Sequence, residues 1–114
     1  MNDGRRVEAR SHMLQSARLV CSYVEGMSRA DFPADTRTQQ AVVMNMIIIG
    51  EAAARLLLEH TEFTQAHADI PWRGMKSMRN RIAHGYFEVD FRIVWDTVQT
   101  SLPDLIARLE TSGA

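Results

Sequence analysis

The segment from Met78 to Tyr86 gathers the side chains of this sequence that are best suited to chemistry. It reads Met-Arg-Asn-Arg-Ile-Ala-His-Gly-Tyr, which places two guanidinium groups, an imidazole and a phenol within nine residues that include no acid. The longer stretch between Asp69 and Glu88 also lacks acids, and its cations are Arg73, Lys76, Arg79 and Arg81. Such a local basic patch suits a phosphate-bearing ligand that binds at one place.

Histidine and arginine are sufficient for one reaction of a phosphate ligand, the cleavage of an RNA phosphodiester without a metal. An imidazole changes its charge close to neutral pH, so His84 is a candidate base or acid. A guanidinium offers a fixed fork of donors to phosphate oxygens, which is the role expected of Arg79. Asn80 is expected to hold the imidazole or to contact the phosphate. Taken alone the pattern is weak, because a histidine at a helix C-terminus is often only a favourable partner of the helix dipole.

The apolar spacing around this segment predicts that a helix carries it. Met75, Met78 and Ile82 recur at i, i+3 and i+7, so they would face a core. Gly85 is predicted to end the helix in the left-handed conformation, which puts His84 at or near the last helical position.

The separation of Arg79 and His84 limits what one helix can do. Five residues on an ideal helix leave these two side chains roughly 140 degrees apart around its axis, with Asn80 between them. A second copy related by a two-fold axis would bring two such polar arcs together and enclose a cleft. We therefore expect a homodimer to complete the site.

The rest of the sequence predicts an all-α chain that forms one domain over residues 1–114. Apolar periodicity predicts helices over residues 8–25, 36–60, 71–84 and from 91 onward, with a short turn at 28–32 and a polar connector at 61–70. Asp35 or Thr36 is expected to cap the second helix and Asp90 the last one. Pro103 is expected to kink or restart that last helix. The sequence shows neither strand-like alternation nor an internal repeat.

The expected helix over residues 36–60 is apolar on nearly every side, so other elements, including a second subunit, should surround it. Asn45, Glu51 and Arg55 interrupt its apolar run, which argues against a membrane span. Glu51 and Arg55, spaced i and i+4, are expected to form an ion pair. The alternative is that Glu51 orients Arg79.

Length, charge and cysteine use narrow the classes of function. A chain of 114 residues suffices for one core, and a net charge of −1 argues against a protein that coats nucleic acid through its overall charge. Cys21 is the single cysteine and has apolar neighbours, which predicts a buried thiol in a cytoplasmic protein, and no signal peptide is evident. The four histidines are dispersed, so neither a metal site nor another cofactor is expected.

A resemblance to a known family gives the basic segment a sharper interpretation. The run from Arg79 to Tyr86 matches the Arg-x-x-x-x-His-x-Tyr pattern of HepT-like toxins in the HEPN superfamily, including the polar residue after the arginine. Further segments resemble that family in the same order along nearly the whole chain: Gly26-Met27-Ser28, Arg37-Thr38-Gln39, Ile48-Ile49-Gly50-Glu51-Ala52, Ile70-Pro71-Trp72, Val94-Trp95-Asp96-Thr97-Val98 and Leu102-Pro103.

The resemblance implies a HEPN-type up-and-down helical bundle of four to five helices that forms a homodimer and a metal-independent ribonuclease cleft. Arg79 and His84 would be the catalytic pair, supported on the RNA by Asn80, Lys76, Arg81 and Arg73. The implied partner is a minimal nucleotidyltransferase antitoxin of the MntA type, which neutralises the toxin by transferring AMP to the motif tyrosine, here Tyr86. An attached AMP would bring negative charge and bulk beside the catalytic pair.

Two points leave room for other interpretations. The chain departs from the family in its long second helix, where Met44-Asn45-Met46 and Ile47 are more apolar than usual, which bears on the dimer contact. The alternative function is a non-catalytic nucleotide-binding or interaction module that serves a nucleotidyltransferase partner.

Overall fold

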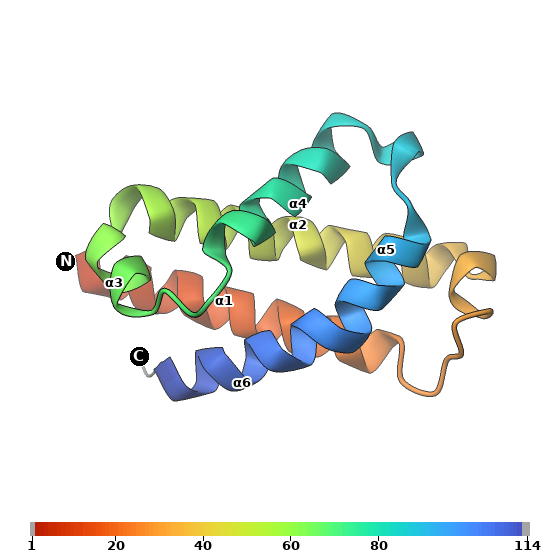
Figure 1. Cartoon of the computed structure of the whole chain (residues 1–114), viewed down its shortest axis with the longest axis horizontal. Coiled ribbons are helices and arrows are strands. Elements are labelled where there is room, and N and C mark those ends of the chain that lie inside the picture. The colour runs from red at the N-terminus through yellow and green to blue at the C-terminus, as the bar shows by residue number, and fades with distance from the viewer. Residues whose placement is uncertain (1, 113–114) are drawn as a thin grey trace.

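Two long antiparallel helices, α1 (Asn2–Tyr23) and α2 (Thr36–Glu59), form the frame of the computed structural model, which describes residues 2–112 (Figure 1). Helix α6 (Leu102–Ser112) packs along α1, and α4 (Trp72–His84) crosses α2 obliquely, so that its C-terminal end rises away from the frame. These described residues contain no strand, which confirms the all-α prediction.

The remaining elements are short and connect the long helices. Helix α5 (Phe91–Asp96) and the π-helical turn η3 (Thr97–Ser101) run into α6 without a break, so the described residues hold five α-helices if these three elements count as one. The short elements are η1 (Phe32–Ala34), α3 (Thr61–Ala66), η2 (Tyr86–Glu88), α5 (Phe91–Asp96) and η3 (Thr97–Ser101).

The stretch over residues 61–70 differs from the polar connector that the sequence predicted, because its first part forms α3. Thr64 in this helix is buried. The indole Nε1 of Trp72 donates to the carbonyl oxygens of Thr64 at 3.2 Å and His67 at 3.0 Å. A buried indole N–H needs an acceptor, so this contact fixes α3 beside the start of α4.

The predicted left-handed ending of α4 at Gly85 is wrong, although the helix does end there. Gly85 has φ −154°, which is extended backbone, and its N–H still bonds to the carbonyl of Arg81. The chain then enters the turn η2, where the Glu88 N–H bonds to the Gly85 carbonyl at 3.0 Å. The chain therefore leaves α4 through an extended residue and a 3₁₀ turn, without a left-handed residue.

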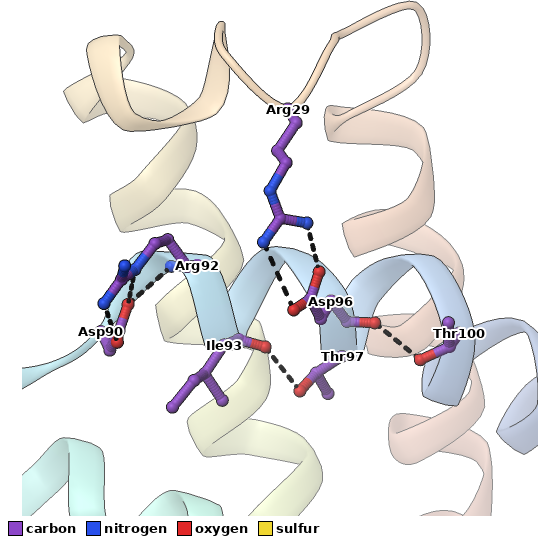
Figure 2. Close-up of polar contacts among 7 residues, drawn as sticks. All are labelled: Arg29, Asp90, Arg92, Ile93, Asp96, Thr97 and Thr100. Atoms are coloured by element: carbon purple, nitrogen blue, oxygen red, sulfur yellow. Dashed lines mark hydrogen bonds and ion pairs between the residues drawn. The ribbon is translucent and has the colours of Figure 1, made fainter.

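The sequence predicted a kink or a restart at Pro103, but the helix does not restart there, because it runs on through the π turn η3 into α6. Proline lacks an N–H and its ring collides with the carbonyl four residues earlier, so a wider π turn relieves the strain. The hydroxyls of Thr97 and Thr100 donate to the carbonyls of Ile93 at 2.9 Å and Asp96 at 2.7 Å along this segment (Figure 2).

Helix α5, which follows η2, packs against Phe32 in the segment that connects α1 and α2. Phe32 is fully buried, and its ring centroid lies 6.0 Å from that of Phe91 and 5.6 Å from that of Trp95. Arg29, in the loop after α1, forms an ion pair with Asp96 of α5 (Figure 2). The exposed ion pair adds little stability, so the aromatic cluster is the main anchor.

Helix α2 is only partly covered within one copy of the chain. Half of its most apolar 18-residue window is buried, although its length and composition alone would allow it to cross a membrane. Met44 and Ile48 remain exposed on it. Cys21 on α1 is half-buried rather than buried, and this burial raises the pKa of its thiol.

Both predicted helix caps are confirmed. Asp35 accepts a hydrogen bond from the Thr38 N–H at 3.0 Å, and Asp90 accepts one from the Arg92 N–H at 2.9 Å. The Thr38 amide and hydroxyl lower the pKa of Asp35, since both stabilise the charged carboxylate.

We expect Asp35→Asn to make the free energy of unfolding less sensitive to pH in the acid range. A carboxyl whose pKa is lowered by folding stabilises the native state above the unfolded value of about 4, and this contribution is lost as the pH falls through the folded value. The asparagine keeps an acceptor but carries no charge. Urea unfolding at several pH values should therefore show a difference between the two proteins that narrows below about pH 4. Parallel curves would contradict the prediction.

Candidate active site

Helix α4 divides into an apolar face that packs on α2 and a polar face that carries the basic segment. Ile82 is only 2% exposed, and Met75 and Met78 are half-buried against the same core, as their spacing predicted. Trp72 holds the N-terminal end of the helix through its indole. Asn80, Arg81 and His84 are thereby left exposed, whereas Arg79 is half-buried beside α2.

The crossing of α2 and α4 depends on Gly50, which lies directly beneath Arg79. A Cβ atom on Gly50 would overlap the Cβ of Arg79 and would lie 2.8 Å from the Met75 carbonyl oxygen. Because backbone atoms of α4 lie this close, the two helices could not keep their separation with any larger residue at position 50. Gly50 therefore determines how near the guanidinium-bearing position comes to α2.

An open hollow beside the crossing of α2 and α4 brings together the two residues of the predicted catalytic pair. We call it the Arg79 hollow; its volume is about 680 Å³, and it is lined by Glu51, Ser77, Arg79, Asn80, Arg81, Ala83 and His84. Glu51 belongs to α2, and all other lining residues belong to α4.

Within the hollow, Asn80 contacts the guanidinium rather than the imidazole. The Arg79 Nε donates to the Asn80 Oδ1 at 2.8 Å. This bond uses one of the five guanidinium N–H donors, so the terminal nitrogens of Arg79 stay available for a ligand. The sequence left the role of Asn80 open between the imidazole and a phosphate; it orients the arginine here.

His84 is the last residue of α4, and its side chain is exposed. Across the described part of the chain its imidazole has no hydrogen-bond partner or ion pair. The C-terminal end of a helix stabilises a nearby positive charge, because carbonyl groups point toward it.

The four basic residues between Asp69 and Glu88 form no ion pair with an acid among the described residues. Ion pairs among residues 2–112 use Arg18, Arg29, Arg92 and Arg108. None of those pairs includes Arg73, Lys76, Arg79 or Arg81. The positive charge predicted for this face is therefore available to a ligand.

The predicted supporting residues do not all lie at the hollow. Arg81 lines it, but Arg73 lines a separate recess beside Leu57 and Pro71. Lys76 is exposed on α4 outside the lining. A helix turns by about 100 degrees per residue, so basic residues close in sequence point to different sides.

The expected ion pair between Glu51 and Arg55 is absent from the described residues. Both side chains instead line a groove between α1 and α2 that also contains Arg5, Glu8 and His12. Glu51 makes no hydrogen bond to Arg79 either, although both line the Arg79 hollow. The carboxylate thus lies between the two recesses without a bound cation.

Tyr86 lies two residues beyond His84 and outside the lining of the hollow. Its side chain is 37% exposed, and its ring meets those of Phe87 and Phe91 edge to face, at centroid distances of 6.1 and 6.3 Å. The phenol is therefore held by ring packing at the end of α4 while its surface stays accessible.

Sequence reasoning overlooked the structural role of Gly50. The available signal was a glycine in the interior of a long apolar helix. Such a glycine lowers the stability of the helix, and its usual reason is the close approach of another backbone.

For metals, residues 2–112 contain no group of three or more His, Cys, Asp or Glu side chains that could hold an ion.

Comparison with known proteins places this geometry in context. The family model described as Ribonuclease HepT-like matches residues 13–112. A protein of Thermococcus cleftensis named "Probable ribonuclease HepT" is 35% identical over 96 residues, which cover 84% of each chain. A protein of Caldanaerobacter subterraneus named "Putative RNase" is 36% identical over 94 residues, covering 82% of this chain and 81% of its own length. No solved structure matches the chain significantly.

We expect Gly50→Ala to destabilise the protein by about 1–3 kcal/mol, because the added methyl group overpacks the crossing of α2 and α4. The matched control is Gly74→Ala in α4, where an added Cβ would meet nothing nearer than the Pro71 Cβ at 3.8 Å. The control should be neutral or up to about 1 kcal/mol more stable, since alanine favours a helix. Urea unfolding of both variants measures the difference, and equal stabilities would contradict the role given to Gly50.

Proposed function

This chain belongs to the Ribonuclease HepT-like family, and we propose that it is a toxin endoribonuclease that cleaves RNA at the Arg79 hollow. The observation that supports this most is that Arg79 and His84 line one accessible hollow, on a helix face whose cations have no acid partners among residues 2–112.

The reaction needs no group beyond side chains of these types. A base removes the proton of the RNA 2′-hydroxyl, and the resulting oxygen attacks the adjacent phosphorus. The bond to the 5′-oxygen breaks, an acid protonates that leaving oxygen, and a 2′,3′-cyclic phosphate remains. His84 serves as base or acid, and the guanidinium of Arg79, oriented by Asn80, stabilises the charge on the phosphorane oxygens. Arg81, which also lines the hollow, is a further contact for the RNA.

A homodimer is part of the proposal, since the reaction uses both an acid and a base. One hollow supplies one imidazole, and a copy related by a two-fold axis would supply the second. The exposed Met44 and Ile48 on α2 favour such a contact, because a second copy could cover them.

We also propose that a minimal nucleotidyltransferase antitoxin of the MntA type regulates the protein by modifying Tyr86. The phenol oxygen would attack the α-phosphorus of ATP, lose its proton, and release pyrophosphate. Tyr86 is accessible, and its hydroxyl has no hydrogen-bond partner in the described part of the chain. The attached phosphate would carry negative charge two residues from His84 and compete with RNA for the same cations.

Cleavage of RNA should depend on the imidazole of His84 and on the planar guanidinium of Arg79. In the presence of a chelator, the purified protein should cut RNA and leave cyclic-phosphate or 3′-phosphate ends. His84→Ala should slow this by about 100-fold or more, the usual contribution of an acid or base. Arg79→Lys should also slow cleavage, because an ammonium lacks the planar fork of donors.

His12→Ala is the matched control for that experiment, since His12 is exposed on α1 and lies outside the hollow. Full activity in His84→Ala would refute the catalytic role. If the unmodified protein cuts no RNA and arrests no growth, yet binds nucleotide or the nucleotidyltransferase tightly, the non-catalytic binding module replaces the ribonuclease.

The modification should appear as added mass on one tyrosine. Intact mass spectrometry of protein made together with the nucleotidyltransferase should show the mass of one or more AMP groups, and Tyr86→Phe should remove the increment. Tyr23→Phe is a close control, because Tyr23 is the only other tyrosine and its exposure of 40% resembles the 37% of Tyr86. An increment that persists in Tyr86→Phe would place the modification elsewhere.

A further inference from the structure

A second recess lies beside the Arg79 hollow and shares two of its residues. We call it the side pocket. Arg81 and His84 line both recesses, so they form the boundary between them. The side pocket has a volume of about 320 Å³, which is at the lower end of the range for sites that bind small ligands. A phosphate held in the hollow would therefore leave its neighbouring nucleoside within reach of the pocket.

The side pocket has apolar walls, which suits the faces of a flat aromatic ring. Those walls come from α4, from the segment after η2, and from α5, and they consist of Met78, Ile82, Val89, Ile93 and Val94. Ile93 is 50% exposed, so its side chain is available for contact. Apolar walls with a few polar groups are typical of sites that bind an organic ring.

The polar groups at the side pocket are one cation, the imidazole of His84 and two carboxylates. Asp90 is already engaged, because both of its oxygens accept hydrogen bonds from the Arg92 side chain. Glu88 is not: its carboxylate makes no hydrogen bond or ion pair within residues 2–112. It folds back toward the end of α4, since a Cβ on Gly85 would lie 3.5 Å from the Glu88 Oε2. Arg81 likewise lacks an ion pair there.

From this arrangement we propose that the side pocket binds a guanine base next to the cleaved phosphate, with Glu88 and Arg81 reading its edges. This inference rests on the proposed ribonuclease function and adds the base preference of the substrate. A carboxylate accepts hydrogen bonds only, and guanine is the one RNA base with two adjacent N–H donors, N1–H and the 2-amino group, on its Watson–Crick edge. A guanidinium donates to the O6 and N7 acceptors of guanine.

The other bases fit this pair of side chains less well. Adenine presents the lone pair of N1 at the place where guanine presents a donor, and this lone pair would face the carboxylate. Cytosine and uracil each offer one donor on that edge. A paired contact of this kind discriminates between bases by roughly tenfold or more. Inosine, which lacks only the 2-amino group, should lose part of the advantage.

The first test uses oligonucleotides with one ribonucleotide in a 2′-deoxy strand, so that only one bond can be cut. The base on either side of that bond is varied among guanine, adenine, cytosine, uracil and hypoxanthine. At one of the two positions kcat/KM should favour guanine over adenine by about tenfold or more. Glu88→Gln should reduce this ratio severalfold, whereas Glu62→Gln, an exposed glutamate on α3, should leave it unchanged.

The second test measures binding and does not depend on catalysis. The 3′- or the 5′-monophosphate of guanosine should bind to the wild-type protein more tightly than the adenosine nucleotide with the same phosphate position, and Glu88→Gln should remove that preference. Equal binding of guanosine and adenosine nucleotides in both pairs, or a preference that Glu88→Gln leaves intact, would overturn the proposal. A guanine preference in binding without RNA cleavage would sustain the pocket and refute the ribonuclease, so the two failures are distinguishable.

Discussion

The close crossing of α2 and α4 at Gly50 is the contact on which the arrangement of the site depends. Arg79 lies directly over this glycine, and the Met75 carbonyl approaches the same point. Since the position of α4 is fixed there, the direction of every side chain on its outer face is fixed with it. A glycine in a helix interior costs helix stability. Here the packing of the two helices offsets that cost. The same contact sets the position of the Arg79 guanidinium beside α2.

The positive charge of the site depends on the absence of acidic residues as much as on the presence of basic ones. The segment over residues 70–87 contains no acid, and the ion pairs of the described chain lie on other elements. The acids nearest to the segment in sequence are held in two different ways. Asp69 is paired with Arg108, whereas Glu88 is left unpaired at the side pocket. An unpaired carboxylate beside a basic hollow favours a ligand that has both a phosphate and N–H donors.

Local sequence patterns predicted the helices and their caps well, but they predicted less well which side chains contact one another. The caps at Asp35 and Asp90 were predictable, because each depends on residues within one helical turn. The connector over residues 61–70 was predicted wrongly, since the contact that orders α3 comes from the indole of Trp72. The ion pair of Glu51 with Arg55 failed for a related reason: spacing on a helix allows a contact but does not enforce it.

The sequence by itself determined the all-α class, the helix that carries the basic segment, and the residue types of the proposed catalytic pair, because periodicity and composition are local properties of the chain. Only the tertiary structure decided which residues share a recess. It joined Arg79, Asn80, Arg81 and His84 in one hollow, added Glu51 from α2, and left Arg73 and Lys76 outside. It also brought Glu88 beside His84 through the turn η2. Spacing along one helix cannot specify these neighbours, because they depend on how α2, α4 and α5 pack against one another.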